Sequence, residues 1–93
     1  MIKSFRDRKA EALFNGEKGD KKWQSFERVA RRKLLMLHAA LTLTDLKSPP
    51  NNHLEALNRD RVGQHSIRIN DQYRVCFVWN RDGADDVEIT DYH

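Results

Sequence analysis

Apolar and polar side chains alternate along most of residues 65–79, and this alternation constrains the fold more than any other feature of the chain. Successive side chains of a strand point to opposite faces, so one parity faces a core and the other faces away. The apolar parity, which continues in the last strand, consists of Ile67, Ile69, Val75, Phe77, Trp79, Val87 and Ile89. The other parity consists of Ser66, Arg68, Asn70, Gln72, Arg74, Cys76, Glu88, Thr90 and Tyr92. The sequence therefore predicts an antiparallel meander whose non-core face carries two guanidiniums and a phenol.

The first half of the chain predicts a short strand and two helices. Residues 2–6 alternate and predict a strand, after which Asp7 can cap a helix that Gly16 ends. From Trp23 to Leu41 apolar residues recur every three or four positions, which predicts a long amphipathic helix that weakens after residue 40 and that the prolines at 49 and 50 end. We expect an α+β fold, with the N-terminal strand and two helices on one face of the sheet and the other face open.

Shorter segments complete the expected order. Residues 53–57 predict an extended piece, and residues 58–61 a polar loop before the hairpin. Asn70 and Asp71 favour a turn between the first two strands, and residues 81–85 favour the next turn.

Length and charge limit the classes of function. A chain of 93 residues predicts one domain, residues 1–93. Residues 1–50 hold twelve Lys and Arg against six Asp and Glu, which suits a polyanion such as nucleic acid, although a solvated charged face is the alternative. The one cysteine, Cys76, excludes an internal disulfide and fits a reducing compartment. Without an apolar run long enough for a bilayer or a signal peptide, we expect a cytoplasmic protein with no membrane partner.

Arginine and tyrosine on the non-core face suggest phosphodiester chemistry. Arginine binds phosphate through a planar, always charged fork, and a phenol beside two guanidiniums can act as general acid or base. The alternative is that Arg68 and Arg74 form surface ion pairs with Asp71, Glu88 or Asp91. His53 and His65 have no partner at a zinc-type spacing, so we expect neither a metal site nor a cofactor.

Residues 63–77, the prolines before them and the ending Asp91-Tyr92-His93 resemble the HigB branch of the RelE-type bacterial toxins. The resemblance covers nearly the whole chain and implies a microbial-RNase-like α+β fold. It implies a ribosome-dependent endoribonuclease that cleaves mRNA in the ribosomal A site of the 70S ribosome, without metal, by attack of the 2′-hydroxyl on the adjacent phosphate. It also implies a HigA-type helix-turn-helix antitoxin that holds the activity in check, with DNA contacted only through that complex.

The resemblance assigns roles to individual residues. The family's transition-state arginine matches Arg74, and its C-terminal tyrosine and histidine match Tyr92 and His93; the parity argument adds Arg68 as a fourth catalytic candidate. The family's basic surfaces bind ribosomal RNA. The candidate RNA- and ribosome-binding residues are Lys21, Lys22, Arg28, Arg31, Arg32, Lys33, Arg59, Arg61, Asn70 and Gln72.

The loop before the hairpin departs from the family pattern. Several HigB-type toxins carry a histidine and a lysine where this chain has Glu55 and Asn58. Either a nearby cation or histidine substitutes, or Arg74 and Tyr92 suffice with the ribosome orienting the message, which predicts a milder toxin. The candidate substitutes are Arg59, Arg61, His53 and His65. A weakly catalytic chain acting mainly as antitoxin partner and transcriptional co-repressor is the alternative function. A stand-alone DNA binder is disfavoured because no recognition-helix pattern is present.

Overall fold

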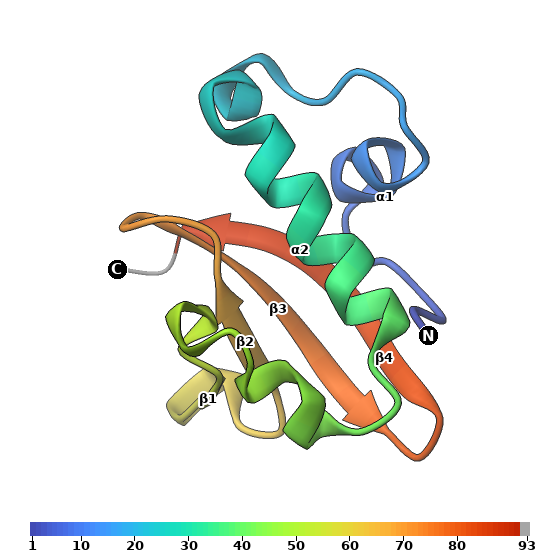
Figure 1. The fold of residues 1–93 in the computed structure, drawn as a ribbon, viewed down its shortest axis with the longest axis vertical. Helices are drawn as coiled ribbons and strands as arrows, with labels where there is room; N and C mark the ends of the chain where they lie inside the picture. Colours follow the sequence, from blue (N-terminus) through green and yellow to red (C-terminus); the bar gives the residue numbers. More distant parts are fainter. Residues whose placement is uncertain (92–93) are drawn as a thin grey trace.

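A four-stranded antiparallel sheet forms the centre of the computed structural model, which describes residues 1–91. The strands follow in sequence order and are β1 (Glu55–Ala56), β2 (His65–Arg68), β3 (Tyr73–Asn80) and β4 (Gly83–Asp91). The helices α1 (Arg8–Phe14) and α2 (Glu27–Ala39) pack on one face of the sheet (Figure 1). The predicted α+β class is confirmed. Tyr92 and His93, which were predicted as catalytic residues, lie outside the described residues.

Helix α1 begins and ends at the predicted residues. The Asp7 carboxylate accepts a hydrogen bond from the Lys9 backbone N–H at 2.9 Å, which caps the first turn. After Asn15, Gly16 adopts a φ of +85°, and its N–H donates to the Leu13 carbonyl at 3.1 Å. Glycine is common at this position after a helix because it adopts the left-handed conformation without steric cost.

The second helix is shorter than predicted. A 3₁₀ helix, η1 (Lys21–Phe26), precedes α2, and α2 ends at Ala39, so the expectation that Leu41 lies on its apolar face is wrong: Leu41 is 87 % exposed. Thr42 and Asp45 form a capping box that starts a new 3₁₀ helix, η2 (Leu43–Lys47), before the prolines are reached. The long helix therefore ends near this capping box, several residues before the prolines that were predicted to end it.

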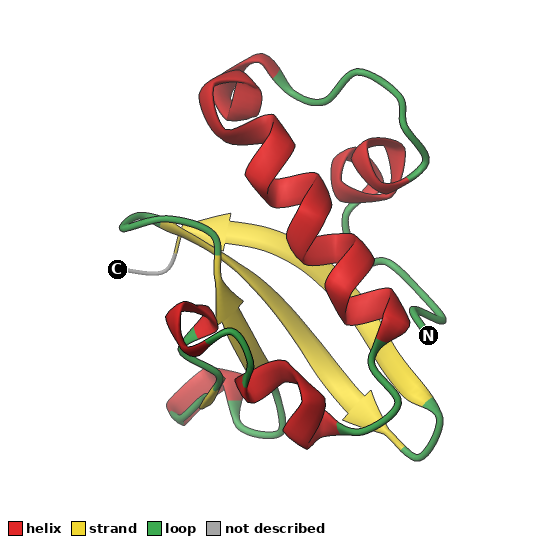
Figure 2. Cartoon of the chain, viewed as in Figure 1, coloured by secondary structure: helices red, strands yellow, loops and turns green. Residues whose placement is uncertain are grey.

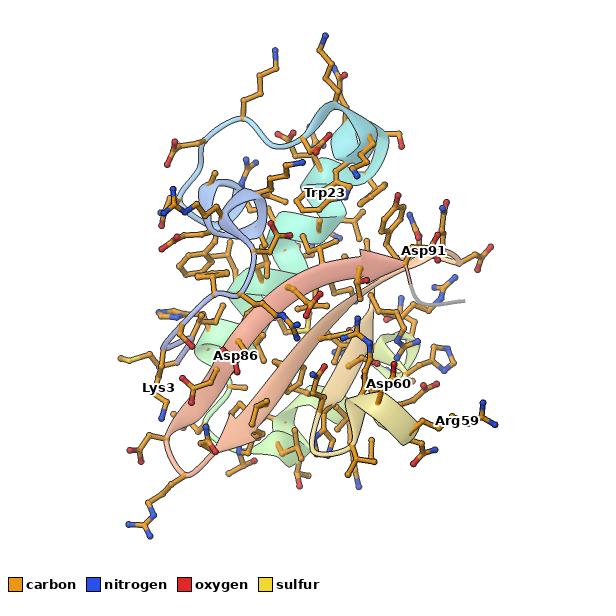
Figure 3. All side chains as sticks on the ribbon, turned by 180° about the vertical axis from the view of Figure 1, so that it is seen from behind. Lys3, Trp23, Arg59, Asp60, Asp86 and Asp91 are labelled. Carbon is orange, nitrogen blue, oxygen red and sulfur yellow. The ribbon has the colours of Figure 1, made fainter. Side chains whose placement is uncertain are left out.

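The predicted N-terminal strand is wrong as a regular element. Residues 2–6 run parallel to β4 but make only isolated bridges, from Ile2 to Ala84 and from Phe5 to Val87. Between these bridges β4 carries a bulge, where Asp86 has a φ of +52° and its N–H donates to the Ser4 hydroxyl at 2.9 Å. The bulge interrupts the ladder, and Figure 3 shows Lys3 and Asp86 at this edge of the sheet.

The predicted apolar parity forms the core. Ile67, Val75, Phe77 and Val87 have no exposed surface and belong to one cluster with the apolar residues of α1 and α2, whereas Trp79 is half-buried at its edge. The bulge in β4 adds one residue between Ala84 and Val87, so that both of these side chains are buried. Among the described helices, none is long and apolar enough to cross a membrane.

The opposite face is not open along its whole length, contrary to the expectation. Ser66 and Cys76, both of the outward parity, have no exposed surface. The segment before the hairpin, with the short helices η3 (Pro50–Asn52) and η4 (Arg59–Arg61), folds around β1 and β2 (Figure 2). From η4, Arg61 reaches across to Glu88 of β4 at 3.6 Å. The part of this face near the β2–β3 turn is less covered, and we look for a functional site there.

Candidate functional site

Arg68 and Arg74 meet on adjacent strands. They are Cα partners in the β2–β3 register, and Arg74 is also the partner of Thr90 in β4. Residues opposite each other in an antiparallel pair place their Cβ atoms about 5 Å apart on the same face, and two like charges in this position repel each other. The two arginines thus start from neighbouring positions on one face, while their guanidiniums contact different groups: Arg74 contacts Ser66 and Arg68 contacts Asp71.

The Arg74 side chain is held in one orientation by three groups. Its Nε donates to the Ser66 hydroxyl at 2.7 Å, and its Nη2 donates to the backbone carbonyl of His53. Its Nη1 lies 3.9 Å from the Glu55 carboxylate, and the side chain is only 12 % exposed. In place of the alternative ion pair with Asp71, Glu88 or Asp91, Arg74 contacts the Ser66 hydroxyl, the His53 carbonyl and the Glu55 carboxylate.

Arg68 makes the surface ion pair that the sequence allowed. Its Nη2 donates to the carboxylate of Asp71, whose side chain is 99 % exposed. An exposed pair of this kind contributes little free energy and is easily displaced by a competing anion. Arg68 is therefore a cation that can exchange its partner, whereas Arg74 is fixed.

The β2–β3 turn and the end of β4 are linked by side-chain amides. The Asn70 side-chain oxygen accepts from the backbone N–H groups of Gln72 and Tyr73 at 2.9 and 2.7 Å, which confirms the predicted turn and shows that this oxygen serves the turn itself. Gln72 Nε2 donates to the Asp91 carboxylate at 2.9 Å. Asp91, labelled at the end of β4 in Figure 3, is the last described residue and lies beside the turn.

Cys76 lies on the same face, and its thiol is unreactive. Burial raises the pKa of its thiol to about 11. At neutral pH the thiol keeps its proton, and a protonated thiol is a poor nucleophile. Cys76 is a small residue that packs in the sheet, as its sequence context indicated.

His65 is on the wrong face to replace the missing loop histidine. Its ring stacks on Phe77 of the core, with ring centroids 6.3 Å apart, and its buried Nδ1 has no hydrogen-bond partner. Arg61 is occupied with Glu88 and with the Gln64 side chain at 3.1 Å. Of the four predicted substitutes for the loop histidine, His53 and Arg59 are the exposed ones.

The basic residues predicted on one helix face divide into three groups. Lys21, Lys22, Arg28 and Arg32 are exposed. Arg31 is half-buried, and its Nε donates to the Leu13 carbonyl of α1 at 3.0 Å. The prediction that Lys33 belongs to this exposed face is wrong, because Lys33 is only 6 % exposed and its ammonium group donates to the Asn52 side-chain oxygen at 2.5 Å.

The buried ammonium of Lys33 has an unusual environment. Burial lowers its pKa, and the nearby charges of Arg32 and Arg68 lower it further. Its partner Asn52 has no exposed surface, and the Asn52 amide donates to the carbonyls of Leu46 and Ser48 at 3.1 and 3.3 Å. Lys33 and Asn52 thus tie α2 to the segment whose next residue, His53, holds Arg74.

Sequence reasoning missed two features of the site. The His53 carbonyl contacts Arg74, and His53 adopts a left-handed φ of 44° that no pattern in the sequence indicates. Glu55 appeared only as a departure from a family pattern, although its carboxylate lies beside Arg74. Within residues 1–91, no group of three or more His, Cys, Asp or Glu side chains is arranged to hold a metal ion.

Comparisons with known proteins agree with the resemblance that the hairpin indicated. A family model described as a RelE-like toxin of the type II toxin-antitoxin system HigB matches residues 3–93. Toxin HigB-1 of Vibrio cholerae serotype O1 is 38 % identical over 80 residues, which are 85 % of this chain and 84 % of that protein. An uncharacterized protein of Haemophilus influenzae is 44 % identical over 52 residues, 56 % of this chain and 52 % of that protein.

Proposed function

Because the chain belongs to the HigB family of RelE-like toxins from type II toxin-antitoxin systems, we propose that it is a ribosome-dependent mRNA endoribonuclease. In the proposed reaction the 2′-oxygen of one nucleotide attacks the adjacent phosphorus and the bond from phosphorus to the 5′-oxygen breaks. The products are a 2′,3′-cyclic phosphate and a 5′-hydroxyl, and no metal takes part. Cleavage of mRNA in the ribosomal A site stops translation and so inhibits growth.

The observation that carries this proposal is the cross-strand pair of Arg68 and Arg74. A guanidinium fixed in advance stabilises the extra negative charge of a pentavalent phosphorane without reorganisation, and Arg74 is fixed by Ser66 and His53. Arg68, held only by an exposed ion pair, is free to exchange Asp71 for a phosphate oxygen. Tyr92 and His93 complete the proposed catalytic set as proton donor and acceptor candidates, by their match to the family.

The proposal includes partners. The type II system implies an antitoxin, which we propose to be a helix-turn-helix protein of the HigA type, and contact with DNA would then come only through that complex. A message on the ribosome as substrate means that the protein acts in the cytoplasm. The exposed cations of η1 and α2 suit contact with ribosomal RNA, whose phosphates Lys and Arg neutralise. These cations are Lys21, Lys22, Arg28 and Arg32. Arg59 and Gln72, which are exposed on other segments, are further candidates for RNA contact.

Replacement of Arg74 tests the proposal in cells. We expect Arg74→Ala to relieve growth inhibition on induced expression and to abolish new 5′ ends within a translated reporter message, mapped by primer extension. Arg81→Ala, at the exposed turn between β3 and β4, removes the same charge elsewhere and should leave growth inhibition and cleavage unchanged. Unchanged cleavage by soluble Arg74→Ala protein would count against the assignment.

Two observations favour a second function. Arg74 is engaged by three protein groups, as a purely structural arginine would be, and Glu55 replaces the loop histidine of similar toxins. A weakly catalytic partner and co-repressor of the antitoxin would have these features. In that case the wild-type chain would leave ribosome-bound messages intact while its complex with the antitoxin still bound operator DNA.

A further inference from the structure

The Arg74 guanidinium depends on a backbone conformation that is unusual for the residue that adopts it. Arg74 Nη2 donates to the carbonyl of His53, which has a φ of 44° and a ψ of 58°. A Cβ atom makes this left-handed conformation unfavourable, so a residue other than glycine adopts it only where its surroundings impose it. The residues around His53 are therefore part of what orients Arg74.

The surroundings of His53 are fixed by its neighbour Asn52. The Asn52 side chain has no exposed surface, and its amide donates to the carbonyls of Leu46 and Ser48 at 3.1 and 3.3 Å. Its side-chain oxygen accepts from the Lys33 ammonium at 2.5 Å. Because Lys33 belongs to α2, these bonds set the position at which His53 begins relative to that helix.

The buried ammonium of Lys33 is a costly partner for this purpose. The Lys33 side chain is only 6 % exposed, and among residues 1–91 its ammonium donates to a neutral amide and pairs with no carboxylate. The positive charges of Arg32 and Arg68 lie near it and, with burial, lower its pKa. A buried cation costs free energy, and an apolar side chain in place of buried charge often leaves stability unchanged or higher. The stability of the core is therefore a poor explanation for Lys33, and the geometry that its hydrogen bond imposes is a better one.

We propose that Lys33 is a positioning residue for the cleavage reaction: through Asn52 and the His53 carbonyl, its ammonium holds the Arg74 guanidinium in the orientation that receives the phosphate. This role rests on the endoribonuclease function proposed above. Lys33 is too deeply buried to touch the message, so it neither binds RNA nor transfers a proton. Its effect is to remove alternative positions of Arg74, because a group that is held in place beforehand needs no reorganisation when charge develops in the transition state.

The orientation of Arg74 is measured directly by the Nε–H signal of its guanidinium in the nitrogen–proton NMR spectrum of the full-length chain. Because Arg74 Nε donates to the Ser66 hydroxyl at 2.7 Å, this proton is protected from exchange with solvent, and Arg74→Lys identifies its signal. Lys33→Met keeps the length of the side chain and removes the ammonium. We expect the Arg74 signal to be lost to solvent exchange in Lys33→Met and to be retained in Lys33→Gln, whose amide still donates to Asn52.

The single-turnover rate of mRNA cleavage on programmed ribosomes shows whether this orientation matters for catalysis. We expect Lys33→Met to lower the rate at saturating toxin by roughly 10- to 100-fold, as a displaced catalytic group does. The toxin concentration that gives half of the maximal rate should stay the same, because Lys33 contacts no RNA. Lys33→Gln should recover most of the rate. Lys47→Met, which changes an exposed lysine at the end of η2, is the matched control and should equal the wild type in both measurements.

The two measurements decide between a positioning role and a role in the fold. Loss of the Arg74 signal with a slower rate in Lys33→Met, and recovery of both in Lys33→Gln, supports positioning. An unchanged signal or an unchanged rate in Lys33→Met overturns it, as does a Lys33→Met chain that circular dichroism shows to be unfolded, since Lys33 would then serve the fold.

The conservative variant and the wild type give the remaining outcomes. If Lys33→Gln is as slow as Lys33→Met, the hydrogen bond to Asn52 is not the cause, and the positioning role is again overturned. A wild-type chain that leaves ribosome-bound mRNA intact contradicts the proposed function instead, while the Arg74 signal still reports whether Lys33 orients the guanidinium.

Discussion

At the scale of single residues, Cys76 makes the pH dependence of stability predictable. Its thiol is buried beside the site, and burial raises its pKa from 9.0 to about 11. Between these two values the unfolded chain has lost the thiol proton while the folded chain retains it. The folded state then binds more protons than the unfolded state. The contribution of this thiol to the free energy of unfolding is therefore fully present below pH 9 and declines as pH rises toward 11.

We expect this thiol to remove up to about 2 kcal/mol from the free energy of unfolding between pH 9 and pH 11. Urea unfolding at both ends of this range measures the loss. Cys76→Ala lowers stability at neutral pH through lost packing but should lack this part of the alkaline decline. Identical pH slopes for the wild type and Cys76→Ala would show that the folded thiol titrates normally.

Residue positions were predictable where strand parity decides them. Arg68 and Arg74 lie on one face, as alternation requires, and Asn70 forms the predicted turn. Lys33 was misplaced because its charge suggested the solvent face, although it stands three residues after Ala30 and four before Leu37 on the buried face of α2. Its partner Asn52 is distant in sequence. The carbonyl that holds Arg74 depends on the backbone angles of His53, which side-chain patterns do not encode.

At the scale of elements, the segment between α2 and the hairpin connects the core to the site. Asn52 joins two residues of this segment to α2: its amide donates to the carbonyls of Leu46 and Ser48, and its oxygen accepts from Lys33 of α2. The next residue, His53, presents the carbonyl to Arg74. The orientation of Arg74 therefore depends on an asparagine that does not touch it.

We expect Asn52→Ala to lower the free energy of unfolding by about 3 kcal/mol, because it leaves a buried ammonium and two carbonyls without their partner. Chemical denaturation provides the measurement. The neighbouring Asn51 is exposed, so Asn51→Ala should change stability by less than about 0.5 kcal/mol. Equal effects of the two substitutions would mean that the Asn52 network is not formed in solution.

Elements were predictable where a residue with one strong local preference marks their end. Asp7 and Gly16 set the ends of α1 in this way. The end of α2 and the bulge in β4 were missed, since the first follows a change to 3₁₀ geometry at Thr42 and the second requires a non-glycine residue, Asp86, in a left-handed conformation. Both depend on contacts that a single pattern does not contain.

At the scale of the whole molecule, charge and fold separate two tasks. The first fifty residues hold twelve Lys and Arg against six Asp and Glu, and four of the exposed cations, Lys21, Lys22, Arg28 and Arg32, lie on η1 and α2. The arginine pair lies on the sheet, on strands from the second half of the chain. The sequence predicted the α+β class and this division of charge. It did not predict the cover over the second sheet face, because the segment that forms it is irregular and has no periodic pattern.

We propose that this chain cuts mRNA only on the ribosome and uses Arg74 to do so. Incubation of the purified full-length chain with one defined message, free or bound to programmed ribosomes, tests it most directly. We predict cleavage of the ribosome-bound message alone, leaving a 5′-hydroxyl, and a rate at least about 100-fold lower for Arg74→Ala. Equal cleavage of free and ribosome-bound message, or an intact message in both, would contradict the account.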